Sequence, residues 1–222
     1  MSSNARAYGG DPLAQHRTAI EVARAVGVGR IVYTSHIAAS ASSIFPPARD
    51  HAATEEMLRH SGLAWTALRH GFYADSGLML MGDGLNTGLI EAPEDGKVSW
   101  TTHADLAEAD AILLASEGRH SGPTRPLTGF KALDLADLAG IASDLLGRVV
   151  ERRVLADDDM KARMVSRGAP EAAATIALGL YRASRAGEFA TVDSTLEQLL
   201  GRRPESIRVL IGTGGKKSQP AR

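Results

Sequence analysis

The sequence predicts an α/β fold: part of a doubly wound parallel sheet, followed by a small, mostly helical C-terminal lobe. Two short apolar runs, at 30–35 and 63–68, carry this prediction, because each follows a helical pattern and ends in polar residues. Apolar runs without alternation are typical of strands buried on both faces, as in parallel sheets. A helix, a glycine turn and a buried strand, found twice in succession, indicate the crossover units of such a sheet.

The first unit occupies residues 12–35. Asp11 followed by Pro12 is a helix start signal, and apolar residues recur at helical spacing up to Val26. Gly27 ends this helix, and the first strand follows. The second unit repeats the pattern, with a helix at 48–61 and the strand at 63–68.

The remaining elements are shorter or less regular. Asp134 and Gly147 mark the two ends of a helix at 134–146 with a continuous apolar stripe. The three aspartates at 157–159 favour the start of another helix. We expect strands at 88–91, 97–100, 124–128 and 149–155, helices at 103–116, within 157–187, at 194–200 and at 204–210, and a flexible tail at 212–222.

Composition excludes several classes of function. The chain has 222 residues with 25 basic and 26 acidic side chains, so its net charge of -1 gives no indication of nucleic-acid binding. Without cysteine it has no disulfide, thiolate nucleophile or zinc–thiolate site. No apolar run approaches the length of a membrane span, and the first residues do not have the pattern of a signal peptide. We therefore expect a cytoplasmic protein that acts on a small molecule.

Polar residues follow both inner strands, where parallel sheets bind ligands. Thr34 and Ser35 end the first strand, Gly71, Phe72 and Tyr73 follow the second, and His51 lies early in the helix between them. Hydroxyl groups can orient a carbonyl, and histidine can transfer a proton near neutral pH. The alternative is that the two hydroxyls only cap the next turn.

Other constellations fit less well. No Gly-x-Ser-x-Gly motif is present, and Ser35 and His36 point to opposite faces of a strand, so they do not form a hydrolase pair. His51 and Glu55 lie one helical turn apart, but no third ligand has suitable spacing. We therefore predict no metal site there and interpret that side of the helix as solvated.

Longer stretches resemble a known family. QHRTAIEVARAVGVGRIVYTS at 15–35 and HAATEEMLRHSGLAWTALRHGFYAD at 51–75 are similar to NmrA-like atypical short-chain dehydrogenases, and most similar to the type 2 NAD(P)H:quinone oxidoreductase subgroup. The stretches 101–116 and 194–210 also resemble that subgroup. The resemblance implies a Rossmann-like domain at 1–130 and a helical substrate lobe at 131–211. It also implies NAD(P)H-dependent reduction of quinones or similar small carbonyl acceptors by hydride transfer.

The resemblance also implies roles for particular residues. His51 occupies the position where the wider family has a catalytic lysine, and Tyr73 is the second catalytic candidate. Asp75 is a weaker substrate-site candidate, since the subgroup commonly has glutamate there. The residues that the resemblance places around the NADPH or NADH cofactor are Ser2, Ser3, Tyr33, Thr34, Ser35, His51, Gly71 and Phe72.

One part of the family pattern is not found. A dinucleotide-binding fold begins with a strand, a Gly-rich turn and a helix that hold the pyrophosphate, and no such turn precedes the strand at 30–35. We therefore expect this chain alone to bind the dinucleotide weakly or not at all. We also expect an exposed edge strand, which favours self-association into a homo-oligomer.

Two further interpretations stay open. The chain could be a non-catalytic regulatory protein of the NmrA type that senses NAD(P) or binds a protein partner. It could also be a fragment without activity, which would unfold without cooperativity. Turnover of a simple quinone with NADPH separates the first of these from the enzyme.

Overall fold

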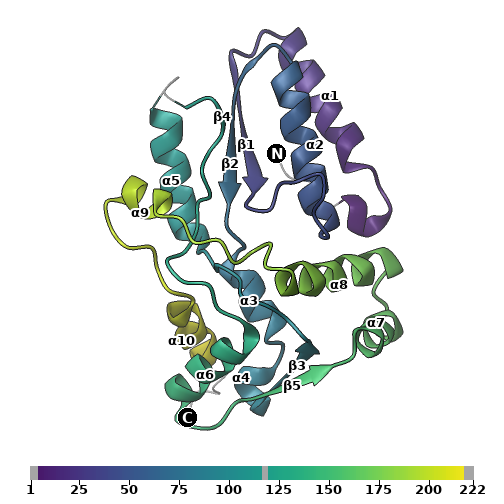
Figure 1. The fold of residues 1–222 in the computed structure, drawn as a ribbon, viewed down its shortest axis with the longest axis vertical. Helices are drawn as coiled ribbons and strands as arrows, with labels where there is room; N and C mark the ends of the chain where they lie inside the picture. The colour runs from purple at the N-terminus through teal and green to yellow at the C-terminus, as the bar shows by residue number, and fades with distance from the viewer. Residues whose placement is uncertain (1–4, 117–119, 218–222) are drawn as a thin grey trace.

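A computed structural model describes residues 5–116 and 120–217 of the chain. Its main sheet has three parallel strands in the order β1-β2-β4, with β1 at Arg30–His36, β2 at Ala64–His70 and β4 at Gly122–Pro123 (Figure 1). The register pairs His36 with His70, so β1 and β2 end at the same level. The fold class and the two parallel helix–strand units predicted from the sequence are confirmed.

Helices cover both faces of this sheet. The helices α1 (Pro12–Ala25) and α2 (Pro46–His60) pack on one face, where Ile20 and Leu58 meet Tyr33 and Ala67. On the other face, α5 (His103–Ala115) and α9 (Thr195–Leu200) pack together over Leu68. Alternating side chains of each strand therefore enter two separate apolar cores.

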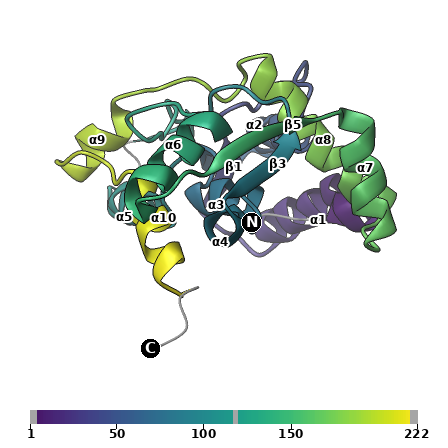
Figure 2. The same cartoon turned by 90° about the horizontal axis from the view of Figure 1, so that it is seen from below.

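A second, two-stranded parallel sheet and the helices around it form the part of the structure that we call the lobe. Unlike the lobe expected at 131–211, it also contains residues 74–93. Its strands β3 (Leu89–Pro93) and β5 (Glu151–Leu155) lie side by side between α6 and the α7–α8 pair (Figure 2). The predicted helix α6 (Leu135–Leu146) has a capping box between Asp134 and Asp137. The other helices of the lobe are α3 (Ala74–Leu80), α4 (Gly84–Thr87), α7 (Asp157–Ser166), α8 (Glu171–Arg185) and α10 (Ile207–Lys217).

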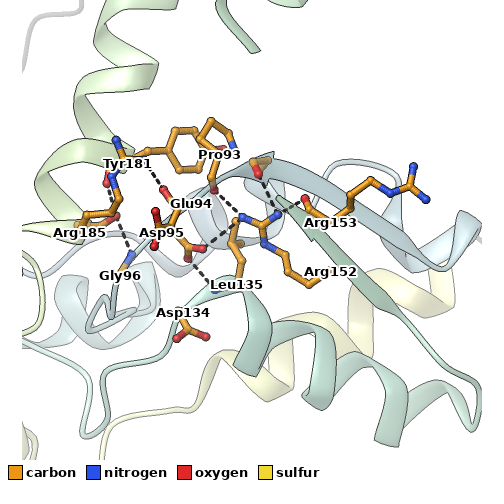
Figure 3. Close-up of polar contacts among 12 residues, drawn as sticks. Pro93, Glu94, Asp95, Gly96, Asp134, Leu135, Arg152, Arg153, Tyr181 and Arg185 are labelled. Carbon is orange, nitrogen blue, oxygen red and sulfur yellow. Dashed lines mark hydrogen bonds and ion pairs between the residues drawn. The ribbon is translucent and has the colours of Figure 1, made fainter. Parts of the chain in front are cut away.

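Arg152 links the small sheet to α6 (Figure 3). Its guanidinium donates to the carbonyl oxygens of Ala92 at 2.8 Å and Pro93 at 2.5 Å and pairs with Asp95 at 3.3 Å. The other carboxylate oxygen of Asp95 accepts the backbone N–H of Leu135, in the first turn of α6, at 2.8 Å. A largely buried arginine thus satisfies the carbonyl groups at the end of β3 and ties them to α6.

Three segments differ from the sequence expectations. The segments expected as strands at 97–100 and 124–128 form only isolated bridges, Val98 with Leu133 and Leu127 with His70. In the first segment Ser99 N–H bonds instead to the carbonyl of Phe189 in irregular chain. In the second segment only Thr124 N–H and Leu127 N–H bond to β2, at the carbonyls of Ala67 and Arg69. The helix α10 continues to Lys217, so residues 212–217 are helical rather than a tail, because α10 packs on α3 and α6.

None of the helices in the described part of the chain is long and apolar enough to span a membrane.

Candidate functional site

Four segments of the chain meet at the carboxyl ends of β1 and β2. The ring of His36, at the end of β1, lies 5.9 Å from Phe45, 5.4 Å from Phe72 and 5.6 Å from Phe189, measured between ring centroids. Phe45 precedes α2, Phe72 follows β2, and Phe189 follows α8. The sheet and the lobe therefore contact each other through an aromatic cluster, which we define as His36, Phe45, Phe72 and Phe189.

Glu188 fixes the loop between β1 and α2 against the lobe. Its carboxylate accepts the backbone N–H of Ile44 at 2.8 Å and a short hydrogen bond from the hydroxyl of Ser43. Ser43 itself is buried, whereas Glu188 is half-buried. The position of Phe45 in the aromatic cluster follows from this anchor, one residue away.

His51 lies in α2 and is held by Tyr33. The hydroxyl of Tyr33, which is fully buried, lies 2.7 Å from Nδ1 of His51. The hydroxyl of Thr54 already donates to the carbonyl of Asp50 at 2.7 Å and lies 2.8 Å from Nδ1 of His16. We assign the Tyr33 proton to His51 Nδ1, because a phenol O–H is a better donor than an imidazole N–H and an imidazole nitrogen is a better acceptor than a phenol oxygen. The His51 proton then lies on Nε2.

Burial keeps both partners uncharged. Burial lowers the pKa of His51 to about 4, and His16 adds to this while Glu55 and Asp50 oppose it. Burial raises the pKa of Tyr33 to about 12. At neutral pH the pair is therefore a phenol and a neutral imidazole, and a neutral imidazole N–H can polarise a carbonyl without transferring its own proton.

Ser35 and Glu55 belong to a buried polar network instead of a solvated surface. The hydroxyl of Ser35 donates to Glu55 at 2.6 Å, and Arg69 binds the same carboxylate through two nitrogens, at 3.0 and 2.6 Å. The exposed fraction of the Glu55 residue is 7%. The sequence interpretation of this helix face as solvated is therefore wrong, because Arg69 at the end of β2 supplies the countercharge.

Tyr73 lies in a different cluster, on the side of α5. Its ring centroid is 4.3 Å from that of His103, whose Nδ1 lies 2.6 Å from a carboxylate oxygen of Asp75. The ring of His70, bound through Nε2 to Asp110 at 2.9 Å, is 6.3 Å away. Burial, with a contribution from Asp110, raises the pKa of the Tyr73 phenol.

Gly71 occupies a position that admits no side chain. A Cβ atom there would lie 2.3 Å from the hydroxyl oxygen of Thr101 and 3.0 Å from the carbonyl oxygen of Leu127. Its N–H donates to that carbonyl at 2.7 Å. Because the backbone of Gly71 packs closely against Thr101 and Leu127, it fixes the direction of the chain after β2 and so the positions of Phe72 and Tyr73.

The structure brings only some of the expected site residues together. His51 and Phe72 lie beside His36, and Tyr33 reaches this group only through His51. By contrast, Ser35 is engaged with Glu55, and Thr34 lies on the opposite face of β1 from Ser35. Ser2 and Ser3 lie outside the described residues. No group of three or more metal-ligating side chains suited to a metal ion occurs in the described ranges.

Sequence reasoning missed two contributors to the site, Phe45 and Phe189. It placed His36 at the end of the first strand, directly after the hydroxyl pair, but assigned it no role. Phe189 lies far from the strands in sequence, and no local pattern connects it with them.

Comparison with known proteins identifies the family. A family profile described as NAD(P)H-binding matches residues 3–117 of the chain. The chain belongs to this NAD(P)H-binding family. Among the curated members, quinone oxidoreductase 2 from Escherichia coli is 36% identical over 189 residues, covering 84% of this chain and 65% of that protein. The NAD(P)H azoreductase of Xenophilus azovorans is 28% identical, covering 86% of this chain and 67% of that protein.

Solved structures of NAD(P)H-binding proteins agree with this assignment. The NADPH complex of the Escherichia coli quinone oxidoreductase superposes with a TM-score of 0.81 at 32% identity, covering 90% of this chain and 70% of that one. Triphenylmethane reductase from Citrobacter sp. gives 0.80 at 29% identity, covering 92% and 71%. The resemblance to NmrA-like proteins is confirmed. The chain spans about two thirds of the length of the curated relatives that it matches.

Proposed function

We propose that this protein is an NAD(P)H-dependent oxidoreductase that reduces quinones or similar small carbonyl acceptors. The observation that carries the proposal is the neutral imidazole of His51, oriented by Tyr33 at the carboxyl ends of β1 and β2. Such a group suits an acceptor whose carbonyl oxygen gains negative charge. The names of the similar proteins, a quinone oxidoreductase and an azoreductase, support the same class of reaction.

The described residues fit the nicotinamide end of a dinucleotide. Phe72 offers a half-buried aromatic side chain, and Nε2 of the neighbouring His36 has no hydrogen-bond partner among the described residues. A nicotinamide is planar and carries an amide oxygen that accepts hydrogen bonds. Whether this chain alone holds the whole dinucleotide stays a prediction, which the titration below measures.

The residues of the chain have separate parts in the reaction. A bound reduced nicotinamide supplies the hydride. His51 donates its Nε2–H to the carbonyl oxygen of the acceptor, and Tyr33 keeps the imidazole in the tautomer that can do so. Because His51 stays neutral, water supplies the proton that completes the hydroxyl group.

The test is NADPH oxidation that depends on 1,4-naphthoquinone, followed by the loss of NADPH absorbance. We expect turnover by the wild type and a decrease of about 10²-fold or more in kcat for His51→Leu, as for the loss of one donor to a developing oxyanion. His60→Leu is the matched control, because His60 is in the same helix but exposed. Equal rates for wild type and His51→Leu would contradict the role of His51.

Thermal unfolding with and without NADPH separates binding from turnover. A ligand that binds only the native state stabilises it by RT ln(1 + [L]/Kd), where [L] is the free ligand concentration, and so raises the midpoint of unfolding. A raised midpoint without quinone turnover would favour the regulatory interpretation over the enzyme. Turnover with a small shift would agree with weak binding of NADPH by this chain.

A further inference from the structure

A cleft of about 720 Å³ lies against α2. The start of α1, the loop after β1, two residues of β2 and Pro123 of β4 complete its lining. Neither His51 nor any residue of the aromatic cluster lines it, so the cleft is separate from the candidate site described above. Its volume is typical of sites that bind small molecules.

Arginines neutralise every acidic side chain in the lining of this cleft. The ion pairs join Arg6 to Asp50, Arg59 to Glu56 and Arg69 to Glu55. In each pair the guanidinium donates two hydrogen bonds to the carboxylate. The cleft therefore presents no unpaired negative charge to a ligand.

Arg49 also lines the cleft, but it has no carboxylate partner among the described residues. Its Nη1 donates to the carbonyl oxygen of Ser43 at 2.7 Å, which leaves its positive charge without a countercharge and its Nε–H and Nη2–H groups unused by those residues. Arg69 binds Glu55 through Nε and Nη2, so its Nη1 is available as well. The cleft thus combines an excess positive charge with unused guanidinium donors.

The rest of the lining is largely apolar. Trp65, from β2, is half-buried and packs with one part on the core between α1, α2 and the sheet, while it also lines the cleft. Alanine side chains from α2 and from the loop after β1 leave the space beside it open. A flat ring can pack on an indole in such a space.

We propose that this cleft binds a planar aromatic anion, with its negative group at Arg49 and Arg69 and its ring on Trp65 and the alanines. A cation would meet the unneutralised charge of Arg49, and an uncharged ligand would leave the guanidinium donors without an anionic acceptor. A carboxylate and a phosphate share the required chemistry. The inference goes beyond the proposed function and does not depend on it.

The experiment uses two anions with flat rings, 5′-AMP and biphenyl-4-carboxylate, and their uncharged analogues adenosine and biphenyl-4-carboxamide. Isothermal titration measures the affinity of the wild type, of Arg49→Gln, which removes the charge, and of Arg49→Lys, which keeps it. Arg167→Gln is the matched control, because it removes an exposed arginine that lies after α7 and outside the cleft.

The position of the ligand is followed through the indole N–H resonances of the two tryptophans. Trp65 lines the cleft, whereas Trp100 is 3% exposed and donates to the carbonyl oxygen of Leu133 at 2.9 Å. The Trp65 resonance should therefore shift when either anion is added, and the Trp100 resonance serves as the internal reference.

We expect Arg49→Gln to weaken the binding of the anions about tenfold, as for the loss of one hydrogen bond to a charged group, and Arg49→Lys to recover part of the loss. Arg167→Gln should bind as the wild type does. Binding of AMP alone would identify the ligand as an aromatic phosphate, and binding of biphenyl-4-carboxylate alone would identify it as an aromatic carboxylate. Three results would overturn the inference: a wild type that binds neither anion, equal affinity for the anions and their uncharged analogues, or binding that Arg49→Gln leaves unchanged.

Discussion

The hydroxyl of Tyr33 lies 2.7 Å from Nδ1 of His51, and this contact joins the centre of β1 to the first turns of α2. Tyr33 is fully buried while His51 is half-buried. The sheet therefore determines which nitrogen of His51 carries the proton and which edge of its ring is free. Tyr33 acts through His51, and its role is to position that ring.

Replacing Tyr33 with phenylalanine should test this relationship. We expect Tyr33→Phe to cost about 1 kcal/mol of unfolding free energy, for the lost hydrogen bond. We expect kcat/KM to fall about tenfold, or about 1.4 kcal/mol, since His51 then populates both tautomers. The tautomer ratio is read from the ¹⁵N shifts of His51. Tyr8→Phe is the control, because Tyr8 is 76% exposed, and a Tyr33→Phe variant that keeps the wild-type tautomer would contradict the assignment.

Removing the charge of Glu55 should destabilise the protein strongly. Glu55→Gln leaves Arg69 beside a neutral amide and weakens the hydrogen bond from Ser35, so we expect a loss of about 3 kcal/mol of unfolding free energy. Glu56→Gln, one residue further along α2, removes an exposed partner of Arg59 and should cost at most about 0.5 kcal/mol. Urea unfolding measures both. Equal losses of unfolding free energy in the two variants would show that the contacts of Glu55 with Ser35 and Arg69 stabilise the protein no more than an exposed ion pair does.

Stability should depend on the two stacked histidines at acid pH. In the folded state the pKa values of His36 and His51 are about 3 and about 4, below the ordinary 6.5, so the unfolded chain takes up protons first. Their contribution to stability is therefore complete above about pH 6.5 and is lost as the pH falls toward the folded values. Between about pH 6.5 and its folded-state pKa, each histidine lowers the unfolding free energy by up to about 1.4 kcal/mol for every unit by which the pH falls.

The measurement is the slope of unfolding free energy against pH between about pH 6 and about pH 5. We expect the slope of His36→Leu to be smaller than that of the wild type by about 1.4 kcal/mol per pH unit. Identical slopes would mean that His36 is protonated equally in both states.

Two glycine substitutions should have opposite effects. Gly71→Ala places a Cβ atom 2.3 Å from the hydroxyl oxygen of Thr101, and we expect a loss of about 2 kcal/mol with a displaced Phe72. Gly140→Ala lies in α6, where nothing approaches within 4 Å, and should stabilise by about 0.5–1 kcal/mol. Thermal unfolding compares the two. A neutral Gly71→Ala would show that the segment after β2 adapts freely.

Local patterns were sufficient for the elements that are stabilised locally. The helix α6 was predicted with its caps because Asp134 and Gly147 mark its ends within the sequence. The strands β1 and β2 were recognisable because burial on both faces requires continuous apolar residues. By contrast, β4 is a two-residue strand whose pairing depends on its neighbour β2, and no pattern of its own predicted its bounds.

The polar part of the site was harder to predict, since it depends on partners that are distant in the chain. His51 was predicted from its place after the first strand, but its partner Tyr33 was expected to contact a cofactor instead. Glu55 looks like a surface residue until Arg69 and Ser35 are placed beside it. His36 gains its significance from three phenylalanines that precede α2, follow β2 and follow α8.

The order of the elements along the chain also determines when the protein can fold during its synthesis. The helices α9 and α10 pack on elements from the middle of the chain: α9 places Leu196 in the apolar core beneath α5, and α10 packs on α3 and α6. A nascent chain on the ribosome that has emerged only as far as β5 therefore exposes apolar surface on both the sheet and the lobe. The core beneath α5 and the core of the lobe cannot close before α9 and α10 are released, so chaperone binding during synthesis would fall on this interval.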